Sequence, residues 1–170
     1  MKDEIQYILD APKSLSIAPN WAREEGNEYL NIVSPLDVDG ITLEGWRFRA
    51  KAHIPSPDMD VTFQIEALFP QMKSKFLPIV RFNWLPRSPH SNHGRGPSEW
   101  RYSSMAGSHI HPYYLNWQDG LPLKDNLPIA LPVSEILPNF QSALVFVEDA
   151  FRIYGVGKLP VPPWEAKKLL

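Results

Sequence analysis

The sequence contains no cysteine among its 170 residues. This absence excludes disulfide bonds, thiolate-bound zinc and cysteine nucleophiles. The sequence also lacks any apolar run near the roughly 18 residues that a membrane-spanning helix needs. Its charged start, Met1 to Glu4, shows no signal-peptide pattern. We therefore expect a soluble, cytoplasmic protein that has no membrane partner.

A large excess of charge of one sign is missing too, because the formal net charge is −2. The chain as a whole therefore does not attract a polyanion. The charge is uneven, however. Residues 73–101 hold six Lys or Arg and one acid, Glu99, and four of the five histidines lie in or just after this segment. This basic strip is the first place to look for a functional site.

The composition is that of an ordinary globular protein, with 44% hydrophobic and 21% charged residues. The length fits one domain over residues 1–170. The 18 prolines are about twice the average usage. Because proline interrupts helices and strands, we expect short elements and many loops.

Apolar and polar residues alternate in several segments, and this period of two is typical of half-buried strands. In residues 41–54, Phe48 and Ala50 fall on one side of the strand, and Arg47 and Arg49 fall on the other. Similar segments are residues 28–34, 61–69, 77–85 and 108–116, with a shorter, proline-rich edge strand at 127–133. The pattern predicts an antiparallel sheet of four to six strands.

Helical spacing of apolar residues predicts one long helix near the C-terminus, at about residues 134–153. Ser134 is the expected N-cap, and Gly155 follows the last turn. A shorter helix is expected at residues 3–10. The fold class is therefore α+β, with the C-terminal helix packed on the apolar face of the sheet.

The opposite, polar face of the sheet is expected to carry the chemistry. In each predicted strand, every second side chain points to the same face, so polar residues from several strands can share one side of the sheet. The predicted set is Arg47, Arg49, Lys51, His53, Arg81, Asn83, His109, His111 and Tyr113. The strand order, which decides whether these residues meet, cannot be read from the sequence.

His109 and His111 lie on the same side of one strand, roughly 6.5–7 Å apart along it. Two imidazoles can act on one phosphate as base and acid, since their pKa lies near neutrality. His90, in the preceding loop, is a third candidate for this catalytic role. Arg81, Arg47 and Arg49 are expected to hold the phosphate, and Asn83 and Tyr113 are expected to contact the substrate. This interpretation requires no metal and no other cofactor.

The same histidines suit a divalent transition metal as an alternative. His109 and His111 would be two ligands, and His90 and His93 could supply the others. Carboxylates are scarce here, and the Glu that a cupin places a few residues after its His-x-His is missing. The composition of the segment therefore disfavours both a cupin and a hard-cation site.

The run Arg81-Phe-Asn-Trp, then Pro89-His90, then His109-x-His111 resembles the TumE-like toxins and related small bacterial proteins. The resemblance covers roughly residues 80–150. It implies a ribonuclease or growth-inhibiting toxin, with RNA as substrate and a cognate antitoxin or other protein as partner. It also implies functional roles for Arg81, Asn83, His90, His109 and His111.

Three functional hypotheses follow. The first is a metal-independent, toxin-like ribonuclease that uses the His/Arg cluster. The second is a non-catalytic phage or mobile-element protein that grips nucleic acid or another anionic partner. The third is a metal-dependent enzyme with histidine ligands.

Overall fold

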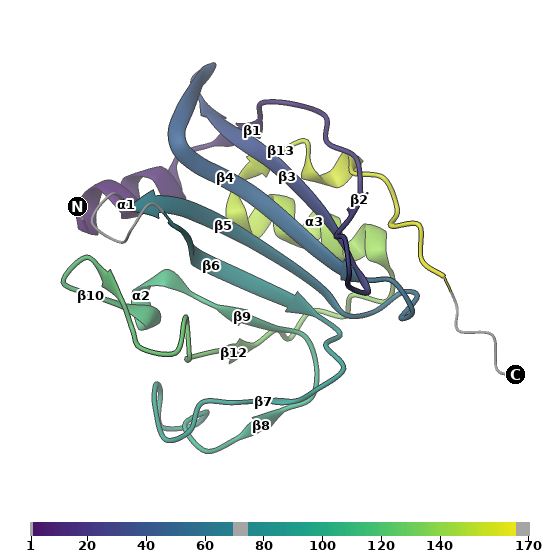
Figure 1. Ribbon diagram of the computed structural model, residues 1–170. Coiled ribbons are helices and arrows are strands. Elements are labelled where there is room, and N and C mark those ends of the chain that lie inside the picture. Colours follow the sequence, from purple (N-terminus) through teal and green to yellow (C-terminus); the bar gives the residue numbers. More distant parts are fainter. Residues whose placement is uncertain (1, 70–74, 166–170) are drawn as a thin grey trace, which may run out of the picture.

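The computed structural model describes residues 2–69 and 75–165 and consists mainly of one large sheet (Figure 1). The nine strands of this sheet run in the order β12-β9-β6-β5-β4-β3-β1-β13, with β2 paired to β3. Two further sheets have two strands each, β10-β11 and β7-β8. The elements are α1 (Lys2–Asp10), β1 (Lys13–Leu15), β2 (Ala22–Arg23), β3 (Tyr29–Val38), β4 (Ile41–His53), β5 (Val61–Phe69), β6 (Lys75–Trp84), β7 (His90–Ser91), β8 (Ser104–Met105), β9 (His109–His111), α2 (Tyr113–Asn116), β10 (Trp117–Gln118), β11 (Leu121–Pro122), β12 (Leu131–Pro132), α3 (Phe140–Phe151), β13 (Ile153–Tyr154) and the 3₁₀ turn η2 (Val156–Lys158).

The predicted α+β class is confirmed, but the predicted sheet of four to six antiparallel strands is wrong in size and in type. The sheet has nine strands, and β1 pairs with β13 in parallel. The strands that the sequence did not reveal are β1, β2 and β13, with two or three residues each. Such short segments are held by pairing with their neighbours and are too brief to show a period of two.

The centre of the sheet is a run of four consecutive antiparallel strands, β3 to β6. Strands β3 and β4 meet at Asp39 and Gly40, which have φ angles of 51° and 76°. A tight hairpin turn needs positive φ at both central positions, and Asp-Gly supplies them readily. These four strands fall close to the segments whose alternation predicted them.

Helix α3 begins six residues later than expected, at Phe140. Asn139 is extended, with φ −147°, and its side chain accepts a hydrogen bond from the Ser142 backbone N–H at 2.9 Å. The Ser142 hydroxyl lies 3.2 Å from the Asn139 backbone nitrogen, which completes a capping box. The cap is therefore Asn139, after Pro138, and not Ser134.

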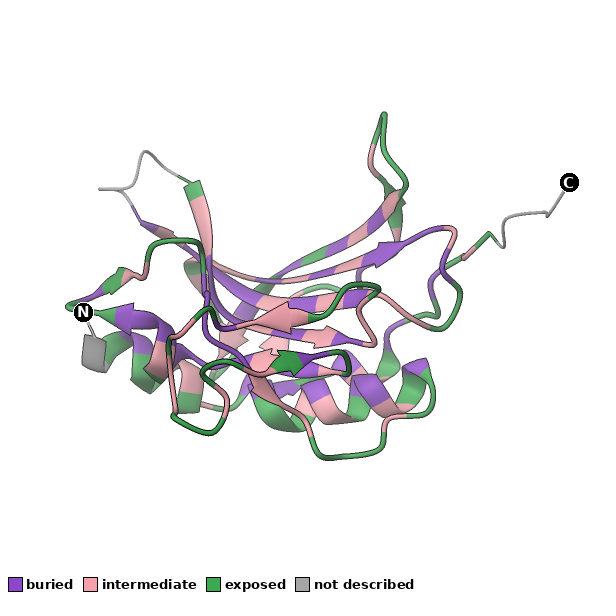
Figure 2. Cartoon of the chain, turned by 90° about the horizontal axis from the view of Figure 1, so that it is seen from below, coloured by how far each residue is buried: buried purple, intermediate pink, exposed green. Residues whose placement is uncertain are grey.

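Helix α3 covers one face of the sheet, as predicted, and Figure 2 shows it on one side only. Its buried side chains pack against apolar residues of β3 to β6 in one core. Those positions are Phe140, Ala143, Leu144, Val147 and Phe151. Trp84 is fully buried in the same core, which fixes the phase of β6. Successive side chains of a strand point to opposite faces, so the residues one and three positions before Trp84 face the other side of the sheet.

Candidate metal centre

Strands β6 and β9 place four of the predicted site residues on the polar face of the sheet. Their antiparallel register sets Arg81 opposite His111, and two residues along it sets Asn83 opposite His109. Directly opposed residues of an antiparallel pair share one face, with Cβ atoms roughly 4.5–5.5 Å apart. The pairing of β6 with β9, which the sequence could not reveal, brings the four side chains together.

A third imidazole reaches this pair from outside the main sheet. His90 begins β7, which pairs with β8 in a separate two-stranded sheet (Figure 1). Its ring centroid lies 5.2 Å from that of His109 and 4.8 Å from that of His111, and the last two are 5.2 Å apart. One ring nitrogen of each residue lies within 4.8 Å of one from each of the others. We call these three residues the histidine cluster.

Fixed acceptors decide which nitrogen of each ring carries its proton. Nδ1 of His109 lies 2.9 Å from the carbonyl oxygen two residues before it, and Nδ1 of His111 lies 2.7 Å from that of Leu127. Nε2 of His90 lies 3.0 Å from the carbonyl oxygen of Pro128. Because a carbonyl oxygen only accepts, each of these nitrogens is the N–H donor. The lone pairs are therefore on Nε2 of His109, Nε2 of His111 and Nδ1 of His90.

The amide of Asn83 lies against two of these lone pairs. Its Nδ2 is 3.0 Å from Nε2 of His109 and 3.1 Å from Nε2 of His111. The Thr62 hydroxyl donates to Oδ1 of the same amide at 3.0 Å. An amide nitrogen has two N–H groups, so it can donate to both rings at once. The contact agrees with the assignment made from the carbonyl groups.

The histidine cluster is held in its neutral form. Burial is the largest cause, and it lowers the pKa of His90 and His109 below the usual 6.5 and that of His111 to about 2. The Arg81 guanidinium lowers the pKa of all three further. Neutral imidazole is the form that ligates metals, whereas a general acid needs the protonated ring.

Three consecutive backbone carbonyls orient the site. Those of residues 126–128 accept, in chain order, from Arg81 at 2.7 Å, from His111 at 2.7 Å and from His90 at 3.0 Å. Residues 125–127 all have left-handed backbone, with φ angles of 72°, 56° and 60°. Non-glycine residues rarely adopt this conformation, and three in a row persist only when neighbouring contacts hold them.

Two buried asparagines hold the segment that follows. Asn92 bonds both backbone groups of Ala130, at 2.8 and 3.0 Å, and Asn116 bonds both of Ile129, each at 2.8 Å. Oδ1 of Asn92 also lies 3.1 Å from Nε2 of His90. Neither residue was predicted from the sequence. Nothing in the local pattern marks them, since their partners lie 38 and 13 residues away in the chain.

Arg47 and Arg49 share the predicted face, but they do not join the histidine cluster. Both project from β4, which β5 separates from β6. Arg47 pairs with Glu66 at 2.5 Å, and Arg49 pairs with Glu24 at 3.1 Å and with Glu66 at 3.6 Å. Carboxylates therefore neutralise this part of the face, which weakens its attraction for a polyanion.

Two further residues lie elsewhere. Strand β9 ends at His111, and Pro112 is the N-cap of the short helix α2, which breaks the strand predicted for residues 108–116. Tyr113 therefore does not continue the strand alternation that puts the two histidines on one face. It packs in a second core cluster that includes Phe69 and Trp117. His93, considered as a metal ligand, is exposed and is not part of the histidine cluster.

A hollow of about 600 Å³ opens beside the cluster. Half-buried His90 lines it together with Arg95, Asp125 and Pro128. Arg95 and Asp125 form an ion pair at 2.9 Å across it. The histidine cluster therefore has one member at an open surface, while His109 and His111 are only 2% exposed.

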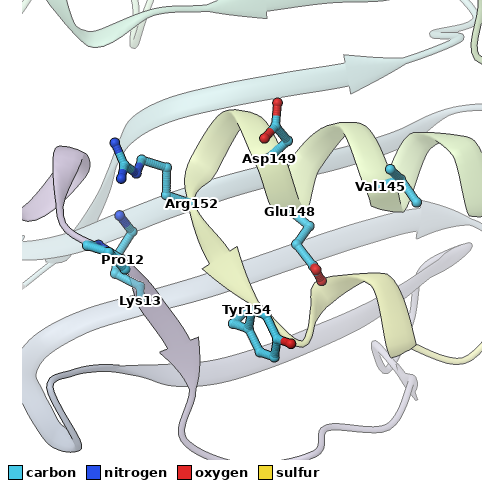
Figure 3. Close-up of a pocket in the computed structure, with 7 residues that line it drawn as sticks. All are labelled: Pro12, Lys13, Val145, Glu148, Asp149, Arg152 and Tyr154. Atoms are coloured by element: carbon cyan, nitrogen blue, oxygen red, sulfur yellow. The ribbon is translucent and has the colours of Figure 1, made fainter.

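A second hollow, of about 430 Å³, lies between β1 and α3 and is lined by Lys13, Glu148 and Arg152 among others (Figure 3). Nζ of Lys13 donates to three backbone carbonyls of residues 8–11, at 2.7–2.9 Å. Burial is the main reason that the pKa of Lys13 falls to about 8. Glu148 accepts from the Gly157 N–H at 2.6 Å. Lys13 and Glu148 already hydrogen-bond to the protein's own backbone. They are therefore less available to a ligand than the imidazoles of the histidine cluster.

The donor set of the cluster indicates the class of ion that it can hold. It supplies three imidazole nitrogens, and no carboxylate belongs to it within the described residues. Such a set favours Zn²⁺ and neighbouring transition metals over Mg²⁺ and Ca²⁺, which prefer oxygen ligands. Three protein ligands with a fourth position left for water or substrate is the pattern of catalytic zinc sites.

Within the described residues, none of the helices combines the length and apolar character that crossing a bilayer takes. No protein-family model matches the sequence, and comparisons with curated proteins and with solved structures find no match either. The resemblance to TumE-like toxins stays a prediction from the sequence.

Proposed function

We propose that this protein is a metal-dependent enzyme that binds a divalent transition metal ion through His90, His109 and His111. The metal would act as a Lewis acid on a ligand at its fourth coordination position. This choice keeps His109, His111 and His90 from the metal alternative and leaves out His93.

One observation carries the proposal. Each ring has one nitrogen donating to a fixed carbonyl oxygen, which leaves one lone pair on each ring, and one ring nitrogen of each histidine lies within 4.8 Å of one from each of the others. A carbonyl acceptor behind a ligating imidazole fixes the tautomer and makes the ring a better ligand. The Asn83 amide satisfies two of these lone pairs in the metal-free protein, and a metal ion would take its place.

A small adjustment of the site accommodates an ion. Tetrahedral Zn²⁺ with Zn–N distances of about 2.0–2.1 Å needs nitrogens about 3.4 Å apart, so the rings must move slightly inward. The Asn83 amide must also present its oxygen instead of its NH₂ group. The Thr62 hydroxyl allows this rotation, because it can accept from Nδ2 as readily as it donates to Oδ1.

Metal-independent cleavage of RNA, the first expectation from the sequence, fits these groups less well. It needs one imidazole protonated as the general acid. Burial and Arg81 both oppose a positive charge on the cluster. The neutral ring is the form of imidazole that ligates a metal, which supports the metal hypothesis.

Equilibrium dialysis and calorimetry with Zn²⁺ and Co²⁺ test the proposal. We expect one saturable site per chain, and His111→Gln should weaken binding by about 100-fold or more, since even an outer partner of a ligand is worth about 10–100-fold. His93→Gln is the matched control, because this histidine lies three residues after His90 but outside the cluster.

Equal binding by all three proteins, or none by the wild type, would contradict a metal function. RNA cleavage by the wild type that continues undiminished in excess chelator and is lost in His109→Ala would instead support the metal-independent ribonuclease. Binding of RNA that no histidine substitution alters would support the non-catalytic alternative.

A further inference from the structure

Arg81 is a positive group beside the histidine cluster. It lies directly opposite His111 across the β6–β9 pair and lowers the pKa of all three imidazoles. On its other side, Gln64 of β5 lies opposite it in register. The guanidinium is therefore fixed between two strands at the edge of the proposed metal site.

The hydrogen bonds of this guanidinium are incomplete. One terminal nitrogen donates to the Asn126 carbonyl at 2.7 Å, while Nε is buried and has no hydrogen-bond partner within the described part of the chain. Buried N–H groups without partners are rare, because an unmade hydrogen bond costs about 1–3 kcal/mol. An orphaned donor beside a metal site indicates that something else supplies its acceptor.

The charge of Arg81 is also uncompensated. Arg47, Arg49 and Arg87 pair with carboxylates, whereas none pairs with Arg81 in residues 2–69 and 75–165. Glu66 acts on Arg81 only at longer range, since its oxygens are engaged by Arg47, Arg49 and Gln64. Burial lowers the pKa of Arg81, and the residue as a whole is half-buried.

Adding a divalent ion to neutral imidazoles beside Arg81 places three positive charges in one partly desolvated site. An anion that enters such a site offsets its positive charge. We propose that the ligand of this centre is an oxyanion, the carboxylate or phosphate group of a substrate, held jointly by the metal ion and the Arg81 guanidinium. This inference rests on the metal-binding function proposed above and names the class of its substrate.

The two anchors have different tasks. The metal ion takes one oxygen of the anion directly at its fourth position. The guanidinium presents a planar fork of N–H donors that matches two oxygens of a carboxylate or phosphate. Because the carbonyl of Asn126 holds one terminal nitrogen, the fork keeps one orientation while the site is empty and while it is loaded.

The experiment uses full-length protein loaded with Co²⁺, whose visible absorption reports the ligands of the ion. Inorganic phosphate and acetate are titrated separately, so that the two oxyanion classes are distinguished. We expect at least one of them to bind saturably and change the spectrum. Arg81→Gln should weaken that binding by about 10- to 100-fold, the range expected for a charge-assisted hydrogen bond, while Co²⁺ uptake is retained.

Arg23→Gln is the control, since it removes the same charge from β2, at the far side of β3, β4 and β5 from the site. Arg81→Lys keeps the charge and loses the fork, and intermediate affinity is expected. This variant also carries the test if Arg81→Gln does not fold. The wild type without metal should bind either anion more weakly than the loaded protein.

The possible failures are distinct. If the wild type takes up no Co²⁺, the metal function is contradicted, and this inference is lost with it. If Co²⁺ binds but neither anion changes the spectrum, or if Arg81→Gln and Arg81→Lys match the wild type, only the oxyanion inference is overturned.

Discussion

Asn92 supports both the segment that contains Ala130 and the histidine cluster. It is fully buried, holds both backbone groups of Ala130 and accepts from His90. We predict that Asn92→Ala lowers the free energy of unfolding by about 1–3 kcal/mol or more, because it leaves buried backbone groups without partners. It should also weaken Zn²⁺ binding by about 10–100-fold, as loss of an outer-shell partner does.

Asn116→Ala provides the matched control, because Asn116 is equally buried and holds both backbone groups of Ile129 without contacting a histidine. Chemical denaturation and zinc titration are measured on both variants. Both should lose stability, and only Asn92→Ala should lose much metal affinity. Parallel losses of affinity in the two variants would show that Asn92 acts through general stability alone.

At the scale of the element, the start of α3 is open to a direct test. Asn139→Ala removes the side-chain acceptor of the Ser142 N–H and should cost about 1 kcal/mol of stability, within the 0.5–2 kcal/mol range of N-cap substitutions. Ser134→Ala is the contrasting variant, since the Ser134 hydroxyl, among the described residues, hydrogen-bonds only to the exposed side chain of Glu135. Urea denaturation that finds the larger loss at Ser134 would place the cap where the sequence alone suggested it.

The elements that the sequence predicted well are those whose signal is local. The alternation around Phe48 and Trp84 fixed which face of β4 and β6 is buried, because burial imposes the period of two. The Asp39-Gly40 turn was equally readable. Two-residue strands such as β2 and β13 carry no such period and form only by pairing with strands distant in the sequence.

The sequence identified residues of the candidate site, but it did not show how they are arranged in space. The phase of β6 and β9 singled out Arg81, Asn83, His109 and His111, and their register then brought them together. Tyr113 was misplaced because Pro112 ends the strand. The carbonyl groups of residues 126–128 left no trace in the sequence, since a backbone acceptor is the same in every residue type.

At the scale of the whole molecule, the neutral histidine cluster makes the metal-free protein sensitive to mild acid. The pKa of each of the three histidines lies below its value of about 6.5 in an unfolded chain. Below about pH 6.5 the unfolded state therefore binds more protons than the folded state, and the free energy of unfolding falls as the pH falls. Each histidine contributes at most about 1.4 kcal/mol per pH unit.

This prediction is checked by urea denaturation of chelator-treated protein between about pH 5 and 6.5, above the range where most carboxylates titrate. His111→Gln should reduce the slope of stability against pH, and His93→Gln serves as the control. A slope that is unchanged in His111→Gln would mean that this ring is not kept neutral by the fold. Saturating Zn²⁺ should raise the free energy of unfolding over this range without reducing the slope, because the ion keeps the folded rings unprotonated while the unfolded chain still takes up protons.

The run of left-handed residues beneath the cluster has one more consequence. The carbonyl oxygens of residues 126–128 overlap this run and belong to adjacent peptide groups, so none can swing away without turning its neighbours. Two imidazoles and a guanidinium therefore gain or lose their supports as one unit. Opening of this short stretch, which the Arg95–Asp125 ion pair ties down at the surface, would release His90, His111 and Arg81 together while strands β6 and β9 stayed intact.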